Sequence, residues 1–238
     1  MEQKKIMPSH TMELPRLIVV GEKNIGKIGN FLKSLNNAKK VSLISGSNVK
    51  KIVQKKIDES LASSNIKKSW YLSKINDAKS IKEIEKNIRK NKTSLLIGVG
   101  GGRSVDIAKM IAFNLGKPFV SIPTSASHDG IASPFVSVKG EKPHSMVATA
   151  PLGVFVDVDV IKRAPKKLLA SGCGDLIAKI TAVRDWQLGN SKTGEYYGRY
   201  SAHLALMSAK ILIENSSRFA KKGPDVREIV EALISAGV

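Results

Sequence analysis

The sequence predicts a doubly wound α/β domain with a mostly parallel sheet, residues 1–160, followed by an all-α domain, residues 161–238. Two observations lead to this prediction for the first part. Short apolar runs alternate there with segments of helical periodicity, which is typical of βαβ units. The run 94–99 is apolar on both faces, as in a parallel strand covered by helices on two sides. From Pro165 onward only helical patterns remain, which predicts the second part.

Most predicted strands are short apolar runs that end at Gly, Ser or Pro. In chain order they are Leu17–Val20, Val41–Ile44, Trp70–Leu72, Ser94–Val99, Phe119–Ile122 and Gly153–Val158. The helices between them have apolar residues three and four positions apart and are Ile25–Leu35, Val49–Leu61, Ile81–Ile88 (with Ser80 as N-cap) and Ser104–Leu115. Two short runs, Phe135–Val138 and Ser145–Ala148, flank Lys139–Pro143 and predict a small hairpin. The later helices are Pro165–Leu188, interrupted at Gly172–Gly174, then Glu195–Asn215 and Asp225–Ser235.

The composition excludes several classes of protein. Among 238 residues 42% are hydrophobic, enough for a sizeable core, so the chain is not disordered. A single cysteine, Cys173, excludes a disulfide framework and a Cys-based zinc finger within one chain. No apolar run reaches the roughly 18 residues that cross a bilayer, and the first residues lack the apolar segment of a secretory signal. We therefore expect a cytoplasmic protein with no transmembrane segment.

The charge is unusual, with a formal net charge of +19 and 21 of the 39 Lys and Arg in the first 96 residues. Three interpretations stay open: a solvated basic surface, a polyanion-binding site, and a field that attracts a small phosphorylated substrate. The positive residues are mostly lysines in helical patterns, such as Lys50 and Lys51, and are not arginines interleaved with aromatics. This pattern favours a solvated surface over specific nucleic-acid binding.

The first motif with a chemical role is the glycine turn Gly98–Asp106, which follows the strand 94–99 and opens a helix. Glycines at such a turn let the backbone approach a diphosphate, and the helix N-terminus presents free N–H groups. The spacing is neither the GxGxxG fingerprint nor a Walker A loop. A tight turn without a ligand is the alternative interpretation.

The second motif, Ser121–Pro134, leaves the end of the next strand and offers several hydroxyls, one imidazole and one carboxylate. Ligands of open α/β sheets bind outside the carboxyl ends of the strands, which favours a functional loop beside the glycine turn. The alternative is that Ser, Asp, Gly and Pro simply form a loop.

The third motif, Ser171–Lys179, places Asp175 just after the predicted break in a helix. A carboxylate in a first helical turn is stabilised by the helix N-terminus, so an N-cap is the plain interpretation. The alternative interpretation is that Asp175 is a metal ligand.

These motifs, in this order and spacing, resemble the archaeal sn-glycerol-1-phosphate dehydrogenases. That family belongs with glycerol dehydrogenases, iron-dependent alcohol dehydrogenases and dehydroquinate synthases. The resemblance extends from about residue 14 to the end of the chain. Its specific part is the Ser-His-Asp-Gly-Ile-Ala-Ser segment, residues 127–133, since the GGG turn alone is shared by the whole group.

The resemblance implies NAD or NADP and Zn²⁺ as cofactors, and dihydroxyacetone phosphate and sn-glycerol 1-phosphate as substrate and product. It implies that Asp129 and Asp175 are catalytic and contact the substrate, and that Asp175 is also a zinc ligand. The residues it assigns to the cofactor are Gly100, Gly101, Gly102, Arg103, Ser104, Val105 and Asp106 at the diphosphate, Thr124, Ser125, Ala126 and Ser127 at the nicotinamide, and Ser133. In chemical terms, a metal ion would stabilise the alkoxide that develops as a ketone accepts a hydride.

The sequence departs from the family at the metal site. The family takes two further His ligands from later in the helical domain, whereas the last His here, His203, lies too early to match either. We read His203 as structural, and we expect the chain to be C-terminally truncated, with both His ligands beyond residue 238. Because a catalytic zinc ordinarily needs three protein ligands, residues 1–238 alone are predicted to be inactive or nearly so.

Two other functions stay open: a glycerol or polyol dehydrogenase of the same superfamily, and a catalytically dead relative that binds polyanions. The stretch Ser45–Lys51 has no acidic residue to bind a ribose diol and has two lysines, a composition that favours NADP. We also expect a homo-oligomer.

Overall fold

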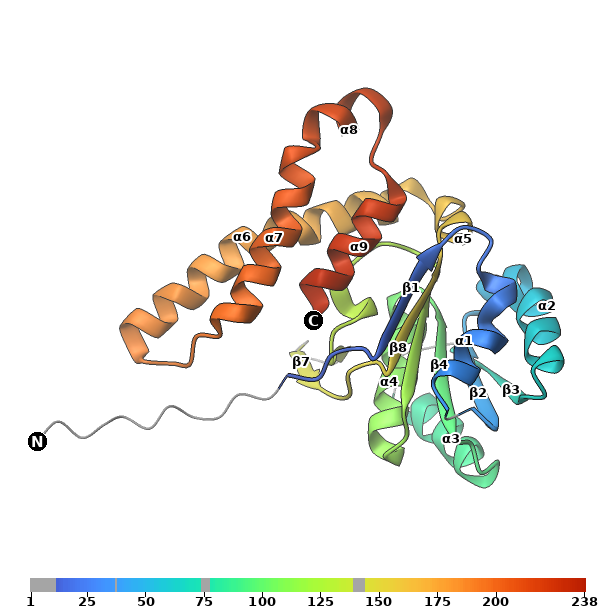
Figure 1. Ribbon diagram of the computed structural model, residues 1–238. Coiled ribbons are helices and arrows are strands. Elements are labelled where there is room, and N and C mark those ends of the chain that lie inside the picture. The colour runs from blue at the N-terminus through green and yellow to red at the C-terminus, as the bar shows by residue number, and fades with distance from the viewer. Residues whose placement is uncertain (1–11, 37, 74–77, 139–143) are drawn as a thin grey trace, which may run out of the picture.

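The computed structural model describes residues 12–36, 38–73, 78–138 and 144–238. Its centre is a six-stranded sheet in which every strand pairs in parallel (Figure 1). The strands are β1 (Leu17–Gly21), β2 (Lys40–Ser45), β3 (Lys67–Leu72), β4 (Leu95–Gly100), β5 (Phe119–Pro123) and β8 (Gly153–Asp157). Their spatial order is β1-β8-β5-β4-β2-β3, so β4 and β5, which carry the first two motifs, are neighbours.

Helices cover both faces of this sheet. On one face η1 (Ile25–Lys27), α1 (Ile28–Ser34) and α2 (Ser47–Ser63) share a core with inward side chains of β2, β4 and β5. On the other face α3 (Ala78–Lys90) and α4 (Gly102–Leu115) pack on Ile44, Leu96 and Phe119. The burial of β4 at all six positions explains its continuous apolar run. The predicted doubly wound sheet followed by a helical region is confirmed.

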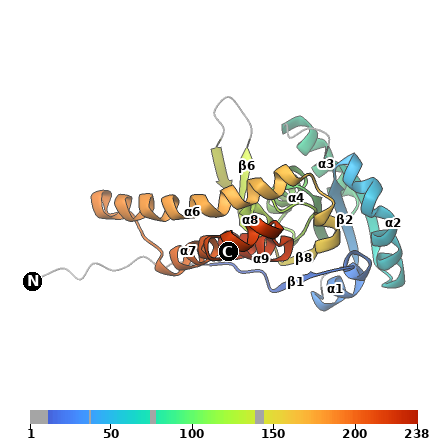
Figure 2. The ribbon, with the colours of Figure 1, turned by 90° about the horizontal axis from the view of Figure 1, so that it is seen from above.

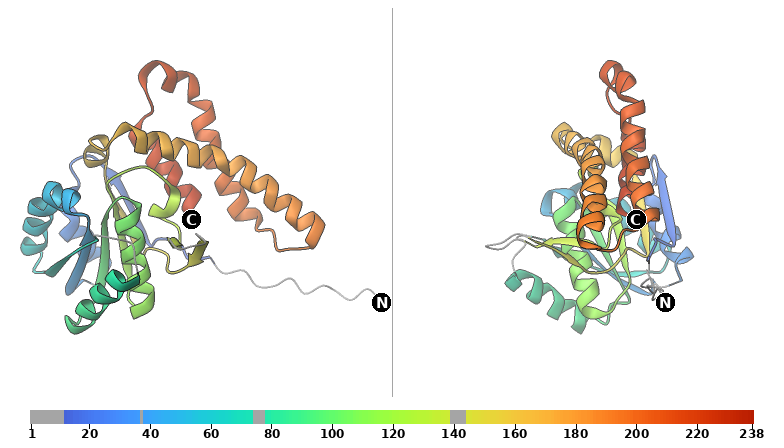
Figure 3. Two further views of the ribbon diagram at one scale, coloured as in Figure 1. Left: turned by 180° about the vertical axis from the view of Figure 1, so that it is seen from behind. Right: turned by 90° about the vertical axis from the view of Figure 1, so that its left-hand side faces the viewer.

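The helical region begins with α5 (Val158–Lys162) and continues through α6 (Lys166–Thr193), α7 (Arg199–Glu214), α8 (Ser216–Lys222) and α9 (Val226–Gly237). Helices α6 and α7 form a long antiparallel pair that projects from the sheet (Figure 2), and the same projection is visible from behind (Figure 3, left). Helix α9 returns to the sheet, where Val230 and Leu233 share a core with Val154 and Val156 of β8. The sheet and the helical region share this core, so the domain boundary at residue 160 stays a prediction.

Several element predictions are wrong in detail. Helix α3 begins at Ala78, so Ser80 lies inside it and is not its N-cap. Helix α6 runs without interruption through Gly172–Gly174, because packing of Gly172 against Ala126 and Leu233 compensates for the poor helix propensity of glycine.

The short helices α5 and α8 were not expected from the sequence, because each spans too few residues for a clear helical period. The hairpin is present as β6 (Phe135–Val138) and β7 (His144–Val147), and its turn, 139–143, lies outside the described residues. In the described part of the chain, no helix combines the length and apolarity that a membrane span requires.

Candidate active site

The glycine turn joins β4 to α4 at the carboxyl end of the sheet. Gly100 has a φ of +151°, a conformation that side chains with a Cβ rarely adopt. Gly101 is the N-cap of α4 in an extended conformation, and no side chain of the described residues caps this helix. The first N–H groups of a helix have no partner further up the helix; that of Ser104 donates to the Gly101 carbonyl at 3.0 Å, and those of Gly102 and Arg103 are available to a ligand outside the end of β4.

The loop after β5 lies directly beside this turn. The amide of Thr124 donates to the Gly100 carbonyl at 2.9 Å, which joins the two segments. The hydroxyl of Ser125 is buried, and it finds no hydrogen-bond partner among the residues the structure describes. A Cβ at Gly101 would lie 3.3 Å from that hydroxyl, so the unpaired oxygen faces the glycine turn. An unpaired buried hydroxyl is costly, and a diphosphate or ribose oxygen placed here would satisfy it.

His128 connects the turn to the next part of the loop, the short helix η2 (Asp129–Ile131). Its Nδ1 accepts a hydrogen bond from the Gly130 amide at 2.9 Å. Its Nε2 lies so close to Gly102 that a Cβ there would be only 2.2 Å away. A larger residue at position 102 would therefore have to displace the His128 ring.

Asp129 and Asp175 meet although 46 residues separate them in the chain. The Asp129 amide donates to Asp175 Oδ2 at 2.8 Å. Lys179, one turn after Asp175 on α6, places its ammonium 2.5 Å from Asp129 Oδ2 and 3.7 Å from Asp175 Oδ1. These three side chains are between 19% and 27% exposed, so solvent and a small ligand reach them.

Asp175 is not an N-cap. It lies well inside the continuous helix α6, which begins at Lys166, so the prediction of a first-turn carboxylate is wrong. Gly172, one turn earlier, brings α6 against the loop, since a Cβ there would lie 2.3 Å from the Ala126 carbonyl. This contact is what places Asp175 beside Asp129.

A metal site is not complete in the described residues. No group of three or more His, Cys, Asp and Glu side chains comes together in this part of the chain. The Asp175 carboxylate is already held by the Asp129 amide and Lys179. His203 is exposed on α7, with its Nδ1 2.6 Å from the Arg199 carbonyl of its own helix. These residues by themselves do not fit a zinc centre, which ordinarily takes three protein ligands.

The remaining predicted residues have different environments. Ser104 donates to or accepts from Ser73 at 2.8 Å in the interior, and Val105 is part of the core, so only their backbone can face a cofactor. Arg103 is exposed. Burial raises the pKa of the Asp106 carboxyl. Ser133 is buried and its hydroxyl accepts from the Phe135 amide at 3.3 Å.

A cavity of about 250 Å³ opens beside the glycine turn. Gly101, Thr124 and Ser125 form one wall. The other walls are mostly apolar and are Asn48, Val49, Ile52, Val53, Val160, Arg163, Ala164, Pro165 and Leu168. The predicted ribose-binding stretch contributes Asn48 and Val49. The connection between α5 and α6 also lines the cavity. No sequence pattern predicts this, because it depends on how the chain folds around the sheet.

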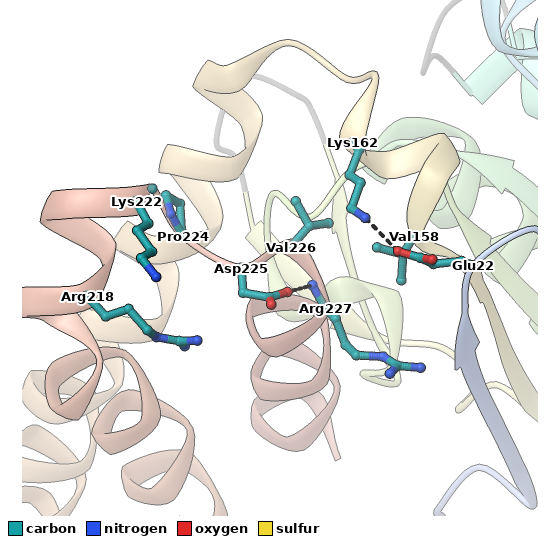
Figure 4. Close-up of a pocket in the computed structure, with 10 residues that line it drawn as sticks. Glu22, Val158, Lys162, Arg218, Lys222, Pro224, Asp225, Val226 and Arg227 are labelled. Atoms are coloured by element: carbon teal, nitrogen blue, oxygen red, sulfur yellow. Dashed lines mark hydrogen bonds and ion pairs between the residues drawn. The ribbon is translucent and has the colours of Figure 1, made fainter.

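A larger hollow, of about 700 Å³, lies elsewhere and is lined by no residue of the three motifs. It contains Lys162, Arg218, Lys222 and Arg227, together with the carboxylates Glu22 and Asp225 (Figure 4). Lys162 is 2.7 Å from Glu22, and Arg218 pairs with Glu228. This mixed pattern does not concentrate positive charge as a polyanion site would.

Comparison with known proteins places the chain in a family. Residues 19–165 match the model of the iron-containing alcohol dehydrogenase family, and the chain belongs to that family. It is 64% identical to a glycerol-1-phosphate dehydrogenase [NAD(P)+] of Nitrosopumilus maritimus and 62% identical to one of Cenarchaeum symbiosum, over 98% of this chain in each case. The resemblance inferred from the motifs is confirmed. The chain spans 66% of the length of these relatives.

Solved structures agree on the fold. A glycerol dehydrogenase from Schizosaccharomyces pombe superposes with a TM-score of 0.83 at 23% identity, covering 97% of this chain and 62% of its own. An iron-containing alcohol dehydrogenase from Thermotoga maritima superposes with a TM-score of 0.75 at 20% identity, covering 95% of this chain and 67% of its own. At these identities the likeness concerns the fold alone.

Proposed function

We propose that this chain carries the cofactor-binding and substrate-binding part of an NAD(P)H-dependent sn-glycerol-1-phosphate dehydrogenase. The proposed reaction reduces dihydroxyacetone phosphate to sn-glycerol 1-phosphate for archaeal ether lipids. The observation that carries the proposal is 64% identity, over 98% of this chain, to a protein of that name. We also propose that it acts in the cytoplasm as a homo-oligomer.

The proposed cofactor site is the glycine turn and the loop after β5. The free amides at the start of α4 bind the diphosphate, and the buried Ser125 hydroxyl donates to a cofactor oxygen. The 250 Å³ cavity accepts another part of the dinucleotide between Val49, Ile52 and Leu168. When bound, NAD(P)H supplies the hydride.

The proposed substrate site is the Asp129, Asp175 and Lys179 group. The Asp129 carboxylate accepts a hydrogen bond from a substrate hydroxyl, and the ion pair with Lys179 fixes the direction of that carboxylate. Asp175 holds the Asp129 backbone in place through the amide. Fixed groups of this kind orient a small substrate beside the cofactor.

The proposed zinc role is limited to Asp175 in this part of the protein. A divalent metal stabilises an alkoxide in such reductions, but the described residues supply one of the ligands that it needs. We therefore expect little turnover from residues 1–238, with or without added Zn²⁺.

The proposed cofactor preference depends on two lysines at the start of α2. Lys50 lies over the Trp70 ring, with its ammonium 5.6 Å from the ring centroid. This contact turns Lys50 towards β3 and leaves Lys51 as the exposed lysine of the stretch that would meet a 2′-phosphate. We propose that both cofactors bind, with NADP favoured.

Binding measurements on the 238-residue chain test the proposal without requiring turnover. Nicotinamide fluorescence reports NADPH and NADH binding, with ATP as a competitor. Calorimetry on the NADP⁺-loaded chain then compares sn-glycerol 1-phosphate, sn-glycerol 3-phosphate and glycerol. Preference for sn-glycerol 1-phosphate supports the proposal, and equal binding of glycerol supports a polyol dehydrogenase. Absence of NAD(P)H binding together with salt-dependent nucleic-acid binding would support the polyanion-binding alternative.

A further inference from the structure

Lys109 is a fully buried lysine that the proposed mechanism does not use. Its side chain has 0% exposure. Its ammonium donates to the Gly130 carbonyl at 2.9 Å and to the Phe135 carbonyl at 2.7 Å. Lysine is almost never buried without partners, because moving an ammonium out of water costs several kcal/mol. Neither solubility nor helix propensity therefore explains why a lysine is buried at position 109.

The two carbonyls belong to the loop that carries the proposed substrate residues. Gly130 directly follows Asp129, and Phe135 lies two residues after Ser133. Lys109 itself is part of α4, the helix whose N-terminus is the glycine turn. A single side chain thus bridges the cofactor-binding helix and two points of the substrate loop.

We propose that Lys109 is a positioning residue that fixes the loop from Asp129 to Phe135 to helix α4, and so sets where Asp129 stands relative to the bound cofactor. This inference rests on the proposed function for the roles of Asp129 and the glycine turn. The bridge itself is a property of the described residues. Lys109 does not touch substrate, because it is enclosed.

The geometry shows that the carbonyls are the main partners of Lys109. Both distances are ordinary for a hydrogen bond, whereas the Asp106 carboxylate is 4.0 Å away, at the limit of an ion pair. An apolar residue of similar length would leave the two carbonyls without this donor in the interior, where an unpaired polar group destabilises the fold. Burial lowers the pKa of Lys109 to about 8, so the ammonium keeps its three donors at neutral pH.

Other contacts hold the loop from different sides. Asp175 and Lys179 of α6 hold Asp129, and His128 bonds to the Gly130 amide. None of these three residues is part of α4. Among the described residues, Lys109 thus joins the cofactor-binding helix to the loop from Asp129 to Phe135 by two hydrogen bonds.

Hydrogen–deuterium exchange followed by mass spectrometry tests this inference on the 238-residue chain. The variant Lys109→Met keeps the length and apolar stem and removes the donors. Lys117→Met is the matched control, since Lys117 is exposed just after the same helix. In Lys109→Met we expect the loop amides from 129 to 135 to exchange about tenfold faster, while β4 and β5 keep their protection.

Addition of NADPH gives a second readout that a merely structural lysine would not change. We expect NADPH to slow exchange at the glycine turn in every variant, but to slow exchange in the loop only in the wild type and Lys117→Met. If NADPH does not bind the wild type, the proposed function fails, and the ligand-free comparison still decides the role of Lys109.

A third variant, Lys109→Gln, separates hydrogen bonding from charge and covers the case in which Lys109→Met does not fold. Its amide retains two donors, so we expect loop exchange between that of the wild type and that of a donor-free variant. The inference is overturned if the loop in a folded Lys109 variant exchanges no faster than in wild type. It is also overturned if Lys117→Met loosens the loop equally.

Discussion

The contact between α6 and the loop after β5 predicts that two neighbouring glycines respond oppositely to the same change. Gly172 and Gly174 both lie inside α6. A Cβ at Gly172 would be 2.3 Å from the Ala126 carbonyl oxygen and 3.1 Å from Leu233, whereas a Cβ at Gly174 would meet nothing within 4 Å. We therefore predict that Gly172→Ala destabilises the fold relative to Gly174→Ala.

The magnitude follows from two opposing contributions. Replacing a mid-helix glycine by alanine stabilises a helix by roughly 0.5–1 kcal/mol, because the unfolded chain loses freedom. At Gly172 the overlap with a backbone carbonyl forces α6 away from the loop, and such overpacking costs about 1–3 kcal/mol. The propensity contribution is common to both variants, so their free energies of unfolding should differ by about 1–3 kcal/mol.

Urea unfolding followed by circular dichroism measures this difference. With a slope near 3 kcal/mol per molar urea, the midpoints of the two variants should lie about 0.3–1 M apart, with Gly174→Ala above the wild type. Equal midpoints for the two variants would refute the claim that α6 lies against Ala126. A lower midpoint for Gly174→Ala would support the helix break that the sequence alone predicts.

Three further predictions concern the site. Asp129→Asn should weaken binding of sn-glycerol 1-phosphate by roughly 10-fold to 100-fold, because a charged hydrogen bond is lost, while fluorescence titration shows NADPH binding unchanged. Ser125→Ala should raise the thermal midpoint, since it removes a buried hydroxyl that lacks a partner among the described residues, and it should weaken NADPH binding; a lower midpoint would mean that the hydroxyl is satisfied. Burial lowers the pKa of Lys109 to about 8, with Asp106 and Asp129 as the carboxylates that face it. Between pH 8 and about 10.4, Lys109 is deprotonated in the native state but still protonated in the unfolded state. The free energy of unfolding of the wild type should therefore rise with pH in this range, by at most about 1.4 kcal/mol per pH unit relative to Lys109→Met. Urea unfolding at several pH values measures this difference, and parallel pH dependences for the wild type and Lys109→Met would contradict the lowered pKa of Lys109.

Local sequence pattern was enough to predict most of the sheet and the position of the glycine turn. Runs such as Leu95–Gly100 are apolar at every position because both faces of the strand are covered. The residues after β4 and β5 could be assigned to one site because ligands gather at the carboxyl ends of neighbouring strands. Prediction failed at Asp175, where glycine spacing indicates a break that packing overrides.

The sequence by itself determined the alternation of strands and helices, the chemistry of the Ser121–Pro134 loop and the family resemblance, since these depend on residues close together in the chain. Only the tertiary structure decided that Asp129 meets Asp175 and Lys179, and that Lys109 is enclosed beneath the same loop. A helix pattern specifies which residues share a face, but not which distant carbonyl that face meets. That choice depends on how α4 and α6 pack around the loop, where the close approach of Gly172 and the two carbonyls bonded to Lys109 decide the geometry.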